Sequence, residues 1–143
     1  VDSLLALAEE ARWQRPQPEA PLKVQTLLDA RMDEVYAASY EFDGQRWSHS
    51  AGYSLLAPQE LVLPAGWALA GNAFAAYGER LPAGVVARIT ALPTATAMLR
   101  LAPQLMAEGL AVAAPDALPT YIRDKVAQTT RERSELKAAR GAA

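Results

Sequence analysis

The chain has 143 residues, of which 51% are hydrophobic and 21% are charged, and its formal net charge is −2. This length and composition predict one globular domain with a hydrophobic core, and the slightly acidic balance argues against a dedicated nucleic-acid-binding domain. With no cysteine and one histidine, His49, the sequence excludes disulfides, thiol catalysis and zinc sites built from cysteine or several histidines. No apolar run approaches the roughly 18 residues that a membrane-spanning helix needs, so we expect a cytoplasmic protein without membrane contact.

The N-terminal half of the chain predicts a helix and then three antiparallel strands. Prolines end the helix, and the first strand becomes apolar on both faces, which is typical of a strand near the middle of a sheet. The Asp43-Gly44 pair supplies the positive φ angles of a type I′ turn and is the strongest hairpin signal in the chain. The expected elements are a helix over residues 2–15, capped by Asp2 or Ser3, and strands over residues 22–29, 34–42 and 45–50.

Short helices and strands alternate in the C-terminal half, where proline and glycine separate the segments. Thr94 or Thr96 should cap the longest helix, and Pro103 should bend it. The expected elements are a helix over residues 58–62, a strand over 67–70, a helix over 72–77, a strand over 85–89, a helix ending at Gly109, and an extended segment from Pro119. This order predicts an α/β fold and resembles the ribonuclease H-like half-domain from which actin-like proteins are built, usually as two copies.

One segment makes the resemblance more specific. Asp29-Ala30-Arg31 followed by Glu34-Val35-Tyr36 resembles the bacterial TsaB family, also called YeaZ, at the turn that joins the first two strands of its second domain. Further segments agree with the family in order and spacing over residues 2–127. They are the helix at Ser3, the Gly71 turn with Tyr77, the helix from Met98 to Gly109, and Pro119-Thr120-Tyr121-Ile122-Arg123, which is similar to a Pro-x-Tyr-Leu-Arg ending.

The resemblance implies a division of the chain into an interdomain helix over residues 1–15, a second actin-like domain over 16–128 and a polar C-terminal tail over 129–143. Members of the family begin with another actin-like domain that contains a Gly-Pro-Gly-Ser-Phe-Thr-Gly segment, which is absent from this sequence. We therefore expect the chain to correspond to the family's second domain alone.

The family also implies a function. Its members are implicated, with the catalytic paralogue TsaD and the ATPase TsaE, in placing a threonylcarbamoyl group on an adenosine of tRNAs that read codons beginning with A. The resemblance thus implies a non-catalytic accessory subunit whose main contact with TsaD lies in the first domain. A glycoprotease-like hydrolase and a generic dimerising interaction domain are the alternatives. Half of a nucleotide cleft should bind ATP negligibly, so we expect no cofactor. The slightly acidic charge balance predicts no direct contact with nucleic acid.

Seven positions of the family motifs have an expected structural or interface role, and none is expected to be catalytic or to bind a metal or cofactor. They are Asp29, Arg31, Glu34, Tyr36, Gly71, Tyr121 and Arg123. Asp29 should cap the turn, Arg31 should pair with a neighbour, and Glu34 with Tyr36 is consistent with a strand edge. The carboxylates Asp29, Asp33 and Glu34 could instead bind a metal or act in acid–base chemistry, an interpretation that we consider weaker.

Two other residue pairs were considered for chemistry. Tyr121 and Arg123 should project the same way and could hold a phosphate or carboxylate, but we favour packing, with Arg123 lying over Tyr121 and pairing with C-terminal acids. Ser48 and His49 resemble a nucleophile beside a base, yet neighbours in a strand point to opposite faces. The aromatic residues expected in the core or at interfaces are Trp13, Trp47, Trp67, Tyr36 and Tyr40.

Overall fold

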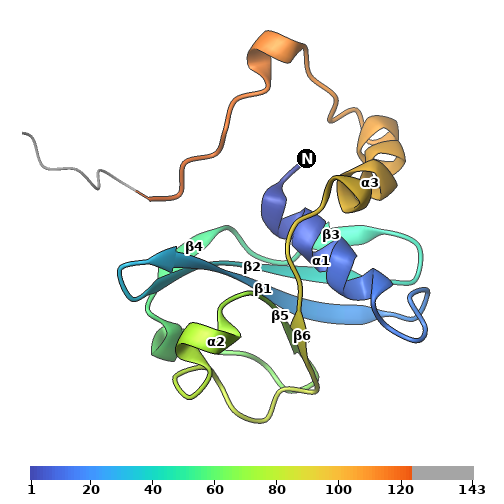
Figure 1. Ribbon diagram of the computed structural model, residues 1–143. Coiled ribbons are helices and arrows are strands. Elements are labelled where there is room, and N and C mark those ends of the chain that lie inside the picture. Colours follow the sequence, from blue (N-terminus) through green and yellow to red (C-terminus); the bar gives the residue numbers. More distant parts are fainter. Residues whose placement is uncertain (124–143) are drawn as a thin grey trace, which may run out of the picture.

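One mixed sheet organises the part of the chain that the computed structural model describes, residues 1–123. Its strands are β1 (Leu22–Arg31), β2 (Glu34–Phe42), β3 (Trp47–His49), β4 (Ser54–Leu56), β5 (Ala68–Gly71) and β6 (Arg88–Thr90). They lie in the order β3-β2-β1-β5-β6, and β4 also pairs with β2 (Figure 1). β1 is antiparallel to β2 and parallel to β5, so it is the central strand that its apolar residues predict.

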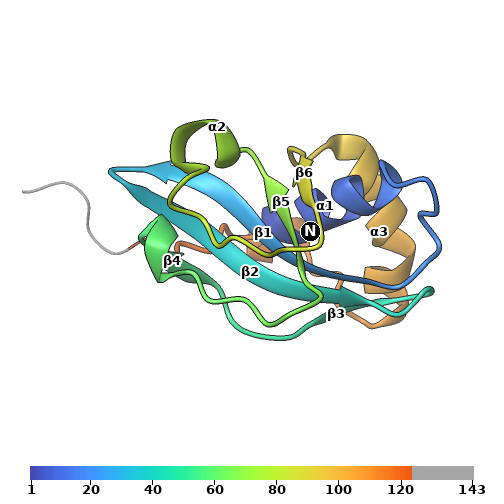
Figure 2. The ribbon, with the colours of Figure 1, turned by 90° about the horizontal axis from the view of Figure 1, so that it is seen from below.

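Helices cover both faces of this sheet. The helices α1 (Ser3–Trp13) and α3 (Ala95–Ala107) lie on one face and α2 (Phe74–Tyr77) lies on the other, while η1 (Pro58–Glu60) and η2 (Ala114–Asp116) are single 3₁₀ turns (Figures 1 and 2). The carboxylate of Asp2 caps α1 by accepting N–H hydrogen bonds at 2.9 and 3.2 Å, and the hydroxyl of Thr94 caps α3 at 3.0 Å. Pro103 lies inside α3. Within residues 1–123, no helix combines the length and apolar character needed to cross a membrane.

Side chains of the central strands alternate between two hydrophobic cores. Val24 and Tyr40 face the side of α1 and α3, whereas Leu27 and Leu69 face the side of α2. This period of two follows from the pleat of a strand, in which successive side chains point to opposite faces. α1 contributes fully buried apolar residues to the first core, so it is packed as part of the same body as the sheet.

A buried carboxylate joins α1, α3 and β3. Glu9 is 2% exposed and accepts hydrogen bonds from Arg12 at 2.7 and 2.8 Å, from the indole N–H of Trp47 at 2.9 Å and from Arg100 at 2.8 Å. Burial alone would raise the pKa of Glu9, but these donors outweigh burial and hold the pKa below its ordinary value. The helix layer is therefore built around a charged, fully partnered group. Trp47 is buried as predicted, whereas Trp13 is exposed and lies beneath the Arg100 guanidinium.

The predicted type I′ turn at Asp43-Gly44 is wrong. Gly44 has φ +109°, but Asp43 is not at positive φ, and the first ladder pair beyond the turn joins Phe42 to Trp47. The Asp43 carboxylate accepts hydrogen bonds at 2.7 Å from the N–H groups of the second and third residues that follow it, which stabilises a four-residue connection. The third strand consequently covers Trp47–His49 rather than residues 45–50.

Three features of the sheet also differ from the predictions. β4 is absent from the predicted elements, because its three residues show no alternation that would identify a strand. β6 begins at Arg88 rather than at residue 85, since the parallel ladder with β5 starts at the Leu69–Arg88 pair. Tyr36 pairs with Leu28 of β1 on one side and with Leu55 of β4 on the other, so the interpretation of Tyr36 as part of a strand edge is wrong. The ladder between β2 and β4 begins at Val35 and does not include Glu34.

Candidate functional site

Residues 29–34 comprise the end of β1, the two-residue turn and the first residue of β2, and are called the β1–β2 tip below. They contain the first group of motif positions. Three consecutive residues in it have left-handed backbone angles, with φ +62° at Arg31, +57° at Met32 and +61° at Asp33. For residues other than glycine this conformation costs about 1–2 kcal/mol each. Figures 1 and 2 both show the tip projecting at one end of the sheet. The chain thus holds a strained backbone at its surface.

Asp29 organises the start of the tip. One of its carboxylate oxygens accepts the N–H of Arg31 at 2.8 Å and the hydroxyl of Tyr77 at 3.1 Å, and the other lies 3.2 Å from the Arg31 guanidinium. The Asp29 N–H donates to the side-chain oxygen of Asn72 at 2.9 Å. Burial and the Asp29 carboxylate raise the pKa of Tyr77, which therefore stays a neutral donor. The Asp29 carboxylate thus caps the turn and pairs with Arg31.

Gly71 lets β5 approach β1 closely. Its φ is +151°, and a Cβ added there would lie 1.8 Å from the carbonyl oxygen of Leu27. The next residue, Asn72, donates its backbone N–H to the same carbonyl at 3.3 Å while its side chain holds Asp29. Gly71 is therefore a structural residue that places the Asn72 side chain against the tip.

Arg123 reaches the tip from the other end of the described chain. Its guanidinium lies 2.8 Å from the Glu34 carboxylate, donates to the carbonyl of Ala30 at 2.9 Å and lies over the ring of Tyr36 at 5.9 Å. The predicted placement of Arg123 over Tyr121 is wrong, because Tyr121 is 86% exposed and Arg123 lies over Tyr36 instead. The predicted pairing of Arg123 with C-terminal acids falls on residues beyond those that the structure describes. The Glu34 carboxylate thus holds Arg123 against β2, whereas the side chain of Tyr121 is exposed to solvent.

Arg80 supports the tip from a third direction, and no pattern in the sequence indicated this contact. Its guanidinium donates to Asp33 at 3.0 Å and to the side chain of Gln59 at 2.9 and 3.1 Å. Arg80 and Asp33 are 47 residues apart, and no local pattern relates residues at that separation. Asn72 is likewise a missed residue, although its position directly after the Gly71 turn was a usable signal.

The three acidic residues of the tip have three different cationic partners. Asp29 faces Arg31, Asp33 faces Arg80 and Glu34 faces Arg123. Across the described residues, no three side chains of the metal-ligating types lie close enough to hold a metal ion. This arrangement suits the bracing of a loop, since each carboxylate is already engaged by a donor.

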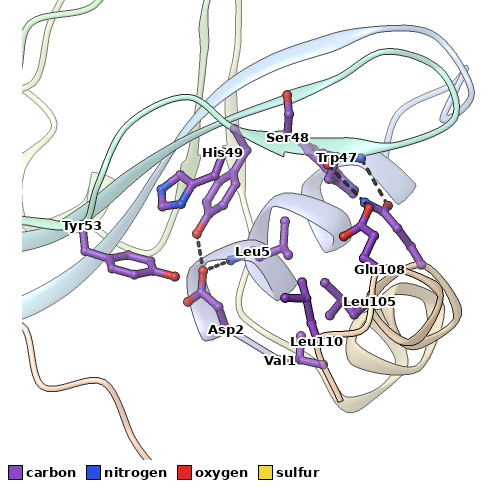
Figure 3. Close-up of a pocket in the computed structure, with 12 residues that line it drawn as sticks. Val1, Asp2, Leu5, Trp47, Ser48, His49, Tyr53, Leu105, Glu108 and Leu110 are labelled. Carbon is purple, nitrogen blue, oxygen red and sulfur yellow. Dashed lines mark hydrogen bonds between the residues drawn. The ribbon is translucent and has the colours of Figure 1, made fainter. Parts of the chain in front are cut away.

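A half-open pocket of ≈ 340 Å³ lies beside the N-terminus of α1 (Figure 3). Tyr40 donates its hydroxyl to Asp2, and burial together with this carboxylate raises the pKa of Tyr40 far above its ordinary value. The ring of His49 stacks on Tyr40 at 4.8 Å, whereas Ser48 points in another direction and donates to the Glu41 carbonyl at 3.3 Å. Ser48 and His49 are therefore not arranged as a nucleophile and its base.

A second pocket of ≈ 670 Å³ lies under the extended residues 118–123. Leu28, Tyr36 and Tyr53 contribute to its walls, and it shares Asp2 with the first pocket. Burial and the charge of Asp2 raise the pKa of Tyr53, as they do that of Tyr40, so these two hydroxyls are neutral at physiological pH. The two pockets offer hydroxyls and apolar walls, which suit binding contacts better than acid–base catalysis.

Residues 1–134 match the family described as TsaD: tRNA N6-adenosine threonylcarbamoyltransferase. The chain is 32% identical over 136 residues to the tRNA threonylcarbamoyladenosine biosynthesis protein TsaB of Escherichia coli (strain K12), with 89% of this chain and 57% of that protein covered.

Two solved structures from Pseudomonas aeruginosa are similar to this chain. One is an uncharacterised protein with similarity to peptidase YeaZ, with 33% identity and a TM-score of 0.75 over 86% of this chain and 57% of that one. The other is YeaZ, with 34% identity and a TM-score of 0.73 over 85% and 58%. These likenesses confirm the ribonuclease H-like, actin-like half-domain that the order of elements predicts. The chain spans a little over half the length of these relatives.

Proposed function

Since the chain belongs to the TsaD-type tRNA N6-adenosine threonylcarbamoyltransferase family, and within it to the TsaB/YeaZ group, we propose that it is the second domain of a non-catalytic accessory subunit in tRNA threonylcarbamoylation. The observation that carries this proposal is the family match over residues 1–134, together with the 32% identity to a protein named for threonylcarbamoyladenosine biosynthesis. The proposed partners of the whole protein are a TsaD-type catalytic paralogue and a TsaE-type ATPase, both in the cytoplasm.

The geometry supports an accessory rather than a catalytic role. Asp29, Asp33 and Glu34 each face a separate arginine, and Ser48 and His49 point apart. A catalytic acid or base must be free to exchange a proton with substrate, which an ion-paired brace is not. These residues therefore favour a scaffold over the peptidase-like activity that the name of one structural relative mentions.

The proposal also covers the division of the chain and its ligands. In it, α1 is the helix between two domains, residues 16–128 form the second actin-like domain, and the polar residues 129–143, a region that the structure does not describe, form a tail. Half of an actin-like cleft supplies one wall of a nucleotide site, so the chain alone should bind ATP negligibly. Isothermal calorimetry with ATP tests this, and micromolar binding would contradict it.

A reconstitution tests the proposed function. Threonylcarbamoylation of tRNA is measured with the TsaD-type paralogue, the TsaE-type ATPase and preformed threonylcarbamoyl-adenylate, with either the gene product in full or the 143-residue chain added. We expect the full gene product to stimulate the reaction and the chain alone to fail, because the main contact with the paralogue is proposed to lie in a first domain. No stimulation by the full product would refute the proposal, and a generic dimerising domain would then be the better interpretation.

A further inference from the structure

The segment that follows α3, residues 108–123, is called the arm below. All of its residues except the last two are exposed, and apart from its last residue it carries two charged residues, Glu108 and Asp116. Its large apolar side chains include Leu110, which is 61% exposed, and Leu118, which is 78% exposed. A long apolar segment that stays exposed to water marks an interaction site, so we expect the arm to contact something outside residues 1–123.

The arm is attached to the rest of the domain at its two ends. At the end of α3, the Leu110 N–H donates to the Leu105 carbonyl at 2.9 Å. At the other end, Ile122 packs against the core on the side of α1, and Arg123 is held by Glu34. Between these points, the backbone hydrogen bonds of the arm join its own residues to one another. The arm is therefore fixed in position, while its middle is exposed to solvent.

The arm arches over the N-terminal end of α1 (Figure 1). The two pockets described above open beneath it, and both are lined by Val1 and Asp2. From the arm, Leu110 lines the smaller pocket, and Leu118 and Tyr121 line the larger one. A residue joined to the amino end of Val1 would therefore lie between the arm and the rest of the domain, next to both pockets.

We propose that the arm and the N-terminal end of α1 form the docking surface for the first domain of the gene product, which fills both pockets and covers Leu110 and Leu118. The inference rests on the proposed function, in which α1 joins that domain to this one. A domain tethered at Val1 has a high effective concentration beside the arm, so a contact of modest area can hold it. The few charges in the arm suit a permanent contact, because the cores of such interfaces are depleted in charged residues.

The same geometry argues against other occupants. A second copy of the chain would have to enter pockets that already receive the residues joined to Val1, and its binding would depend on the protein concentration. A phosphate backbone needs an excess of positive charge. The side chains from residues 1–123 that line the smaller pocket include the carboxylates of Asp2 and Glu108 but no lysine or arginine.

Hydroxyl-radical footprinting, quantified by mass spectrometry, measures the exposure of these side chains in the full gene product and in the 143-residue chain. We expect Leu118 and Tyr121 to be oxidised at least about fivefold more slowly in the full product. The reference is Val62, which is 87% exposed and lies between two residues of the core on the side of α2, and its oxidation should agree within about twofold. Tyr40, which is 2% exposed, should stay unlabelled in both proteins and so shows that each is folded.

Two variants of the full product give a second measurement. Leu118→Asp places a charge in the proposed contact, whereas the matched control Val62→Asp places one on the other side of the sheet. Both side chains are exposed in this domain, so neither change should unfold it. Because burying an unpaired charge is costly, Leu118→Asp should raise the oxidation of Tyr121 at least about threefold, and Val62→Asp should change it by less than about twofold. Protection within one molecule should also persist on about tenfold dilution.

Equal oxidation of Leu118 and Tyr121 in the full product and in the chain alone would overturn the inference. Protection that is lost on dilution would assign the arm to a second copy and would overturn it too. Either result in a product that stimulates tRNA modification would leave the proposed function standing. Protection of the arm in a product that does not stimulate the reaction would support the contact and refute the function. A product that shows neither protection nor stimulation would refute both.

Discussion

Replacing Gly71 with alanine should destabilise the sheet at the point where β5 meets β1. The added Cβ would lie 1.8 Å from the carbonyl oxygen and 2.8 Å from the carbonyl carbon of Leu27, and both atoms belong to the backbone. Cβ atoms essentially never approach other atoms closer than 3.0 Å, so the two strands would have to separate by about 1 Å. A flexible side chain could turn away from such a contact, but a paired strand cannot.

The cost follows from what this separation breaks. The Asn72 N–H donates to the Leu27 carbonyl at 3.3 Å across this contact, whereas the Ala91 N–H, which donates to the Gly71 carbonyl at 3.2 Å, lies on the β6 side of β5 and is kept. Losing the first hydrogen bond costs about 1 kcal/mol, and holding alanine at φ +151° adds about 1–3 kcal/mol. A total near 3 kcal/mol corresponds to a fall in Tm of about 10 °C for a domain of this size.

Thermal unfolding followed by circular dichroism measures this loss, and two other glycines separate its causes. Gly66 has φ +87° with nothing within 4 Å of an added Cβ, so Gly66→Ala should lose only about 1 kcal/mol from backbone strain. Gly52 also has open space and is not at positive φ, so Gly52→Ala should change the Tm little. If Gly71→Ala unfolds at the same temperature as Gly66→Ala, the close approach of β5 to β1 is wrong.

Three further predictions concern charged and titrating groups. Glu9→Gln should lower the Tm at neutral pH. Because the folded pKa of Glu9 lies below its ordinary value, the stabilisation by its ionised form is complete above about pH 5 and is lost as the pH falls through the folded pKa. The difference in Tm between Glu9→Gln and the unaltered protein should therefore become smaller in acid. The control Glu19→Gln, at an exposed position, should show no such trend. Arg123→Ala removes the Glu34 ion pair and the Ala30 hydrogen bond, so chymotryptic cleavage at Tyr121 should become severalfold faster. Arg123→Lys should increase the cleavage rate less. Equal cleavage rates in the variants and the unaltered protein would show that Arg123 does not hold the extended residues 118–123. Tyr40→Phe should leave the ultraviolet titration of tyrosine unchanged up to about pH 11, because burial and Asp2 keep Tyr40 protonated there, and a lower amplitude would contradict this pKa shift.

The sequence predicted those parts of the fold that local patterns determine. β1 and β2 follow from their apolar residues, and the caps at Asp2 and Thr94 follow from the side-chain oxygens that a helix N-terminus requires. β4 and β6 were missed or displaced because three-residue strands are defined by their partners rather than by their own composition. Their positions depend on contacts that no local window contains.

The candidate site shows the same limit. Asp29 and Arg31 were predicted to form a capped turn because both partners lie within three residues of each other. The contacts of Arg80 with Asp33 and of Arg123 with Ala30 join residues that are 47 and 93 positions apart. Residues 31–33 have left-handed backbone angles, but none of them is a glycine, which is the residue that would indicate such angles from the sequence. The family resemblance identified the segment as important, but the geometry that makes the tip rigid required the structure.

The buried carboxylate of Glu9 has a consequence for how the domain assembles. Its donors come from α1, from β3 and from α3, so all three must be in place before the carboxylate can leave water without a large penalty. An assembly in which α1 docks without α3 would bury a charge with part of its partners missing. The helix layer should therefore close over the sheet in a single cooperative step, and a pull on the N-terminal end of α1 would be transmitted to both β3 and α3.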